Sequence, residues 1–248
     1  MSGHNKWSTI KHKKGKADAA RGRLFTKLIK EITIAARMGG GSEEANPRLR
    51  TAVLAAKAAN MPSDNVTRAI KKGTGELEGV SYEDISYEGY GPEGVAIIVE
   101  CVTDNKNRCV SEVRHAFTKH NGKLAEPGSV AWMFKETGRV ALEGEGIDGD
   151  ALLMAAMDAG ADDVVDSDGS FEVLCPTTAL EKMTNAMNGA GFTVSESGRP
   201  MVPANTVQVE GKGAGTLIRL LEHLESLDDV QNVWSNFEMD DSLLDSIE

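Results

Sequence analysis

Apolar residues recur at helical spacing between positions 24 and 36 of the chain. They occupy positions i, i+3, i+4 and i+7, which lie on one side of an α-helix. This stripe consists of Leu24, Phe25, Leu28, Ile29, Ile32, Ala35 and Ala36. The opposite face would carry a row of cations, Arg23, Lys27, Lys30 and Arg37. The three glycines at 39–41 predict the end of the helix, because glycine accepts the left-handed conformation found there.

Two shorter helices are predicted after these glycines. Asn46 and Pro47 are typical of a helix start, since the asparagine can cap the first turn and proline suits the first helical position. Ser63 would cap a further helix that ends before Gly73. Residues 1–78 are therefore predicted to be a basic arm and a three-helix domain, which we expect to bind nucleic acid.

Strand patterns dominate after residue 78. Residues 87–94 are rich in glycine and predict turns, and Asp168-Gly169 predicts the tight turn of a hairpin. The predicted strands are 95–102, 130–134, 139–142, 163–166, 171–175, 192–194, 206–209 and 230–234. The predicted helices are 109–119, 150–158, 178–187 and 217–227.

This order predicts an α+β fold, in which the N-terminal three-helix domain is followed by two βαββαβ-type domains. Residues 79–136 and 202–248 would form one split domain, and residues 137–201 would be inserted into it. The βαββαβ plan is common to many proteins and does not indicate a function.

Charge is distributed unevenly along the chain. Residues 1–75 contain 16 Lys and Arg against 5 Asp and Glu, whereas residues 76–248 contain 11 against 33. A basic segment on an otherwise acidic chain indicates a polyanionic partner for that segment. The acidic remainder would repel nucleic acid from other approaches and so orient its docking.

The basic segment supplies the candidate binding residues. We expect nucleic acid to contact Lys6, Trp7, Lys11, Lys13, Lys14, Lys16, Arg21, Arg23 and Lys27, with Arg48 and Arg50 as weaker additions. Trp7 lies among these cations and could stack on an exposed base or fill a gap between helices. A solvated run of charge with no partner is the alternative for the arm.

Other candidate chemistry is weaker. Gly211 to Thr216 lacks the GK[ST] ending of a phosphate-binding loop, which favours a flexible strand-to-helix turn over a nucleotide-dependent enzyme. The spacing of Asp162, Asp163, Asp166 and Asp168 does not match a calcium loop. No nucleophile and base are suitably arranged. We therefore expect a non-enzymatic protein with no catalytic residues, metal or cofactor.

The cysteines and the hydropathy of the chain indicate in which cellular compartment the protein works. Cys101 and Cys175 are predicted core residues in strands, and Cys109, a weak candidate for an activated thiol, is assigned to the core as well. No run of about 18 apolar residues exists, and the charged N-terminus does not match a signal peptide. These features favour a cytoplasmic protein without membrane contact.

Many separated motifs along the chain resemble the YebC/PmpR family. They are Gly3-His4, Lys6-Trp7, the Lys11 to Lys16 cluster, Phe25-Thr26-Lys27, Gly39-Gly40-Gly41, Asn46-Pro47-Arg48-Leu49-Arg50, Tyr87-Glu88-Gly89-Tyr90-Gly91-Pro92, Thr103-Asp104-Asn105, Asn107-Arg108 and Glu112-Val113-Arg114-His115-Ala116-Phe117. Glu93 departs from the pattern, since members of the family often have glycine there.

The resemblance implies a cytoplasmic bacterial protein with a helical N-terminal domain and two α+β domains. Members are described as probable DNA-binding transcriptional regulators. Others resemble ribosome-associated translation factors that bind RNA, and the mitochondrial relative resembles a translational activator of cytochrome oxidase. A protein partner at the acidic domains is a further expectation. Phosphate contacts alone do not separate DNA from RNA, because they carry no sequence information.

Overall fold

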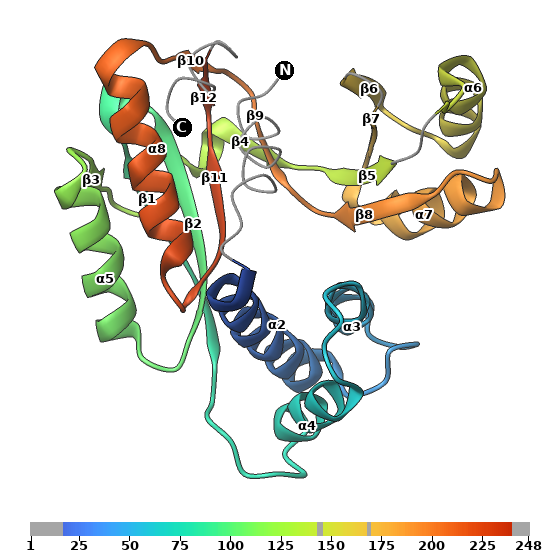
Figure 1. Cartoon of the computed structure of the whole chain (residues 1–248), viewed down its shortest axis with the longest axis horizontal. Coiled ribbons are helices and arrows are strands. Elements are labelled where there is room, and N and C mark those ends of the chain that lie inside the picture. Colours follow the sequence, from blue (N-terminus) through green and yellow to red (C-terminus); the bar gives the residue numbers. More distant parts are fainter. Residues whose placement is uncertain (1–16, 143–145, 168–169, 240–248) are drawn as a thin grey trace. The chain divides into compact units, whose positions relative to one another are not determined.

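The structure is a computed structural model that describes residues 17–142, 146–167 and 170–239 (Figure 1). These residues form helices followed by sheet-containing parts, which confirms the predicted α+β class. They divide into two compact units. The first contains the described residues up to Met133 and from Pro203 onward, and the second is Phe134–Val202.

The described part of the first unit begins with α2 (Ala17–Gly39), α3 (Pro47–Ala58) and α4 (Ser63–Gly73). Their apolar faces meet in one core, in which Ile32, Leu49 and Val53 have no exposed surface. α4 begins one residue earlier than predicted. Ser63 is its first helical residue and makes no capping hydrogen bond, so the predicted serine cap is wrong.

Asn46 joins the end of α2 to the start of α3. Its side-chain oxygen accepts a hydrogen bond from the backbone N–H of Leu49 at 3.1 Å, which confirms the predicted cap. Its amide nitrogen donates to the carbonyls of Ala35 at 2.7 Å and Gly40 at 2.9 Å. One buried side chain thus bonds to backbone groups at the end of α2 and at the start of α3.

The first unit also contains a four-stranded antiparallel sheet in the order β11-β2-β1-β3. Its strands are β1 (Glu83–Tyr90), β2 (Ala96–Thr103), β3 (Lys123–Leu124) and β11 (Val230–Ser235). Two helices, α5 (Lys106–Lys119) and α8 (Gly211–Ser226), share its core, where Ile97, Phe117 and Leu217 are fully buried.

The sheet contains other strands than those predicted from the sequence. β1 covers much of the stretch predicted as turns, because Gly89 is a strand residue whose missing side chain leaves room for Phe117. A Cβ on Gly89 would lie 2.7 Å from the Phe117 ring. The predicted strands 130–134 and 206–209 do not join the sheet.

The remaining short elements of these regions pair elsewhere. A short 3₁₀ helix, η1 (Pro92–Gly94), connects β1 to β2, and another, η2 (Ala131–Met133), precedes β4 (Phe134–Glu136). β4 pairs with β9 (Met201–Pro203), and β10 (Val207–Gln208) pairs in parallel with β12 (Phe237–Glu238).

The second unit has the predicted βαββαβ order, and its four-stranded sheet runs β6-β7-β5-β8. Its elements are β5 (Gly138–Leu142), α6 (Gly149–Ala159), β6 (Asp163–Ser167), β7 (Ser170–Cys175), η3 (Thr177–Ala179), α7 (Leu180–Gly189) and β8 (Val194–Gly198). β6 and β7 pair as the predicted hairpin, whose turn residues 168 and 169 lie outside the described residues. Val140, Leu152 and Met183 form part of its core.

The three cysteines occupy core positions. Cys101 in β2, Cys109 in α5 and Cys175 in β7 are all buried and unpaired. This burial confirms their assignment as small core residues.

A buried ion pair connects α2 to the sheet of the same unit. Lys30 Nζ lies 2.7 Å from Asp229 Oδ1 and also donates to the carbonyl of Asp228 at 2.8 Å. Arg108 and the Thr103 hydroxyl each donate to Asp229 Oδ2 at 2.8 Å. Burial would raise the pKa of Asp229, but these donors hold it below its ordinary value.

The Asp229→Asn substitution should therefore destabilise the first unit. It would leave the Lys30 ammonium buried without a counter-charge, which we expect to lower the free energy of unfolding by about 3 kcal/mol. Chemical denaturation and amide exchange of α2 measure the effect. Asp228→Asn is the matched control, because that neighbouring side chain is exposed. In a Lys30→Met background Asp229→Asn should cost less, and strictly additive costs would contradict the pairing.

Two histidines meet where α5 packs beside α8. His120 Nε2 lies 3.2 Å from His223 Nδ1, and the His115 ring lies 6.1 Å from that of His223. Burial lowers the pKa of both His120 and His223. The charges of Lys119 and His115 lower both values further, and those of His223 and Arg219 add to the effect on His120.

Stability should consequently fall as the pH drops below the ordinary histidine pKa of 6.5. The unfolded chain binds these protons more tightly than the folded one, so the stabilisation present above that pH is lost towards the lower folded-state values. Denaturation between pH 7.5 and 5.5 measures this slope. The His120→Gln/His223→Gln variant should have a shallower slope than the parent, and equal slopes would contradict the lowered pKa values.

Candidate nucleic-acid interface

The cations of α2 do not form one open row. Arg21 and Arg23 are exposed, and neither contacts another described side chain in an ion pair. Lys27 instead donates to the Glu225 carbonyl at 2.8 Å, and Lys30 is buried against Asp229. The prediction that Lys30 lies on a solvent-facing row is therefore wrong, because that face of α2 contacts the α/β part of the first unit.

The last cation of this row lies at the far end of α2. Arg37 donates to the Ser81 hydroxyl and to the Tyr82 carbonyl, and so holds the segment that leads into β1. Only the N-terminal end of the described helix therefore presents cations that lack such contacts among the described residues.

Arg48 is held between two carboxylates. Its guanidinium donates to Glu31 at 2.7 and 3.0 Å and to Asp84 at 2.7 and 2.9 Å. Hydrogen bonds to Asp84 and then to Glu31 raise the pKa of Arg48 above its ordinary value. The guanidinium donates to both carboxylates, so this side chain links α2 and α3 to β1. It has few N–H groups left to bind a phosphate.

The Arg50 side chain forms hydrogen bonds to the loop before α3. Its guanidinium donates to the carbonyls of Glu43 at 2.8 Å and Glu44 at 3.1 Å. The side chain is half-buried and helps to order the turn between α2 and α3.

Three cations on α4 were missed by the sequence analysis. Arg68, Lys71 and Lys72 are exposed, and their i, i+3, i+4 spacing puts them on one face of the helix, opposite the buried Val66 and Ala69. The spacing alone could have identified this face. Arg37 and Lys57 are exposed as well, but Arg37 is bonded to Ser81 and Tyr82, and Lys57 lies 3.6 Å from Glu43. We therefore group the α4 cations with Arg21 and Arg23 as the open cations of the described helical part.

The remaining candidates belong to the arm. Lys6, Trp7, Lys11, Lys13, Lys14 and Lys16 lie outside the described residues.

The glycine-rich stretch at 211–216 is helical, which corrects the predicted flexible turn. Gly211 to Thr216 form the first turns of α8, with Ala214 fully buried. A Cβ on Gly213 would lie 2.6 Å from the carboxylate of Glu93, so glycine permits a close approach to η1.

Within the described residues, no set of three or more His, Cys, Asp and Glu side chains is arranged to hold a metal ion. None of the described helices combines the length and apolar content needed to cross a membrane.

Comparison with known proteins identifies relatives over almost the whole chain. A probable transcriptional regulatory protein of Geobacter sulfurreducens is 56% identical over 239 residues, covering 96% of each chain. One of Desulfotalea psychrophila is 54% identical over 248 residues, covering 100% of this chain and 99% of the relative. The crystal structure of a conserved hypothetical protein from Aquifex aeolicus matches with a TM-score of 0.86 and 45% identity, covering 94% of this chain and 96% of that one.

Two family models account for both the helical and the α/β parts. Residues 5–76 match the TACO1/YebC protein N-terminal domain, and residues 82–237 match the TACO1/YebC second and third domains. The chain therefore belongs to the TACO1/YebC family, as its sequence motifs indicate.

Proposed function

We propose that this protein is a non-enzymatic regulator of gene expression that binds DNA through its N-terminal domain. The names of the relatives support a role in transcriptional regulation. The observation that carries the proposal is the concentration of cations in the first 75 residues of an otherwise acidic chain. A localised positive surface attracts polyanions, and the acidic remainder disfavours other orientations.

The proposed surface combines the arm with the open cations of the helical part. It consists of Lys6, Trp7, Lys11, Lys13, Lys14, Lys16, Arg21, Arg23, Arg68, Lys71 and Lys72. Lys27 and Arg50 are secondary members, because their cationic groups already donate to backbone carbonyls. Arg48 is left out, since Glu31 and Asp84 neutralise its charge.

Salt dependence tests the electrostatic part of this proposal. If about six of these cations contact phosphates, the logarithm of the duplex affinity should fall with the logarithm of salt concentration at a slope of about −5. The variants Lys11→Ala/Lys13→Ala/Lys14→Ala and Arg68→Ala/Lys71→Ala/Lys72→Ala should each make the slope shallower by up to about 3 and weaken binding similarly for all sequences. Fluorescence anisotropy with a labelled duplex measures both quantities.

The matched control for these variants is Lys135→Ala/Lys212→Ala. Both lysines are exposed and lie in the α/β parts of the chain. This control should leave the slope unchanged. A flat salt response of the parent protein, or an equal loss in the control, would contradict the proposed surface.

The nature of the nucleic acid requires a separate measurement, because phosphate contacts do not distinguish DNA from RNA. We expect the protein to be retained on a promoter fragment and not to sediment with ribosomes at the same salt concentration. The reverse result would reassign it as a ribosome-associated translation factor that uses the same cations on RNA.

A further inference from the structure

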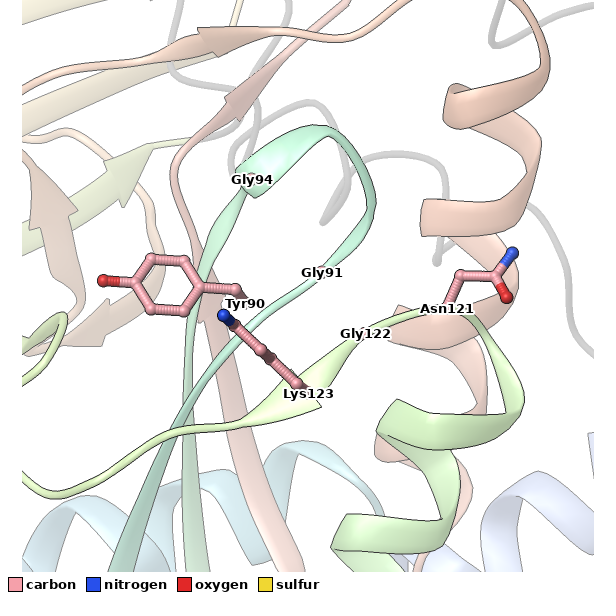
Figure 2. Close-up of a pocket in the computed structure, with 6 residues that line it drawn as sticks. All are labelled: Tyr90, Gly91, Gly94, Asn121, Gly122 and Lys123. Atoms are coloured by element: carbon pink, nitrogen blue, oxygen red, sulfur yellow. The ribbon is translucent and has the colours of Figure 1, made fainter.

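A hollow of about 560 Å³ lies beside the β1 and β3 strands (Figure 2). Its described lining consists of Tyr90, Gly91, Gly94, Asn121, Gly122 and Lys123. The size is within the range of pockets that bind small organic molecules. Three glycines contribute to the lining. A side chain on Gly91 or Gly122 would meet the protein's own core, whereas Gly94 has open space beside it, where a ligand could approach the backbone closely.

The hollow has an aromatic face and a cation. Lys123 Nζ lies 5.7 Å from the centroid of the Tyr90 ring, and Figure 2 shows the two side chains next to each other. Lys123 is exposed and is the only charged residue in the described lining. This positive charge is notable because residues 76–248 contain three times as many acidic as basic residues, 33 against 11.

A second aromatic residue, Trp132, hydrogen-bonds to the same backbone carbonyl as Tyr90. The Tyr90 hydroxyl and Trp132 Nε1 each donate to the carbonyl of Ser129 at 3.1 Å. Trp132 nevertheless has 70% of its surface exposed. A tryptophan with its polar atom satisfied and its ring in solvent is unusual, since indole rings normally bury their large apolar area.

The loop that carries Ser129 is fixed by a buried carboxylate. Glu88 accepts hydrogen bonds from the backbone N–H groups of Gly128 at 2.7 Å, Val130 at 2.7 Å and Ala131 at 2.8 Å. Burial alone would raise the pKa of Glu88, but these three donors lower it, so it stays ionised and holds the loop near neutral pH. The two rings are therefore positioned before any ligand arrives, which reduces the entropic cost of binding.

Two acidic side chains next to lining residues in the sequence are directed elsewhere. The Glu88 carboxylate is used by the loop, and that of Glu93 lies against Gly213 of α8. An anionic ligand would thus meet the Lys123 ammonium without a neighbouring carboxylate in the described lining.

From this arrangement we infer that Tyr90, Lys123 and Trp132 form a binding site for an unpaired nucleotide of single-stranded nucleic acid. The base stacks on the exposed Trp132 ring, and Lys123, which lies over Tyr90, contacts a phosphate. Aromatic rings with a nearby cation are the combination that binds single strands with little dependence on sequence. The inference rests on the proposed function, because it assigns a second contact to the same class of ligand.

The test uses the full chain and a 12-nucleotide oligouridine that carries one 2-aminopurine, together with its DNA counterpart. The fluorescence of 2-aminopurine falls when the base stacks on an aromatic ring, and anisotropy of a labelled copy reports total binding. Trp7→Ala is present in every protein, so that quenching does not come from the arm. We expect quenching with the parent, its loss and about tenfold weaker binding in Trp132→Ala, and retention of both in Trp132→Phe.

The charge contribution is tested in the same way. Lys123→Ala should weaken binding and make the salt slope shallower by about 0.7, the value for one phosphate contact on a single strand. Lys135→Ala, at another exposed lysine, should do neither. Comparison of the RNA and DNA probes then shows which strand the site prefers.

Two results would overturn the inference. They are quenching that is unchanged in Trp132→Ala, and equal effects of Lys123→Ala and Lys135→Ala. Either result could occur while the duplex still binds with a steep salt dependence, in which case the proposed function stands and only the single-strand site is rejected. If duplex binding were absent but the quenching intact, the proposed duplex-binding function would be rejected and the single-strand site would stand. Unfolding curves of each variant confirm that the loop is intact.

Discussion

The buried pair between Lys30 and Asp229 determines what the helical part of this protein can present to a partner. Asp229, immediately before β11, accepts hydrogen bonds from Lys30, Arg108 and Thr103, and so brings together α2, α5 and β2. Removing a charge of this kind from water is costly unless its partners are well placed. Because they are, one face of α2 is committed to contacts inside the first unit.

This commitment divides the cations of the N-terminal part into two groups. Lys27, Lys30, Arg37 and Arg48 hold the helices to the sheet and to the segment before it. Arg21, Arg23 and the α4 set remain exposed. A count of positive residues therefore overstates the charge available to a nucleic acid, since carboxylates neutralise Lys30 and Arg48 while carbonyls accept hydrogen bonds from Lys27 and Arg37.

Glycine has a different role in this chain from the one that local sequence indicates. Gly89 lies inside β1 because Phe117 occupies the space of its side chain, and Gly213 lies inside α8 because Glu93 approaches it. Neither contact is local, so a glycine-rich run looks like a turn or a loop in sequence. Glu93 itself has a φ of 58°, in the left-handed region that glycine adopts readily.

The sequence by itself determined α3 and α4, the inserted βαββαβ unit, the buried cysteines and the concentration of positive charge, because capping residues, hydrophobic periodicity and composition act over short distances. Only the tertiary structure decided that Lys30 is buried, that Arg48 is paired on both sides, that β1 is the strand between β2 and β3, and that Tyr90 donates to the same carbonyl as Trp132. Each of these depends on residues far apart in the chain, such as Lys30 and Asp229. Local patterns cannot specify such pairs, since packing and charge compensation select them only when the chain folds.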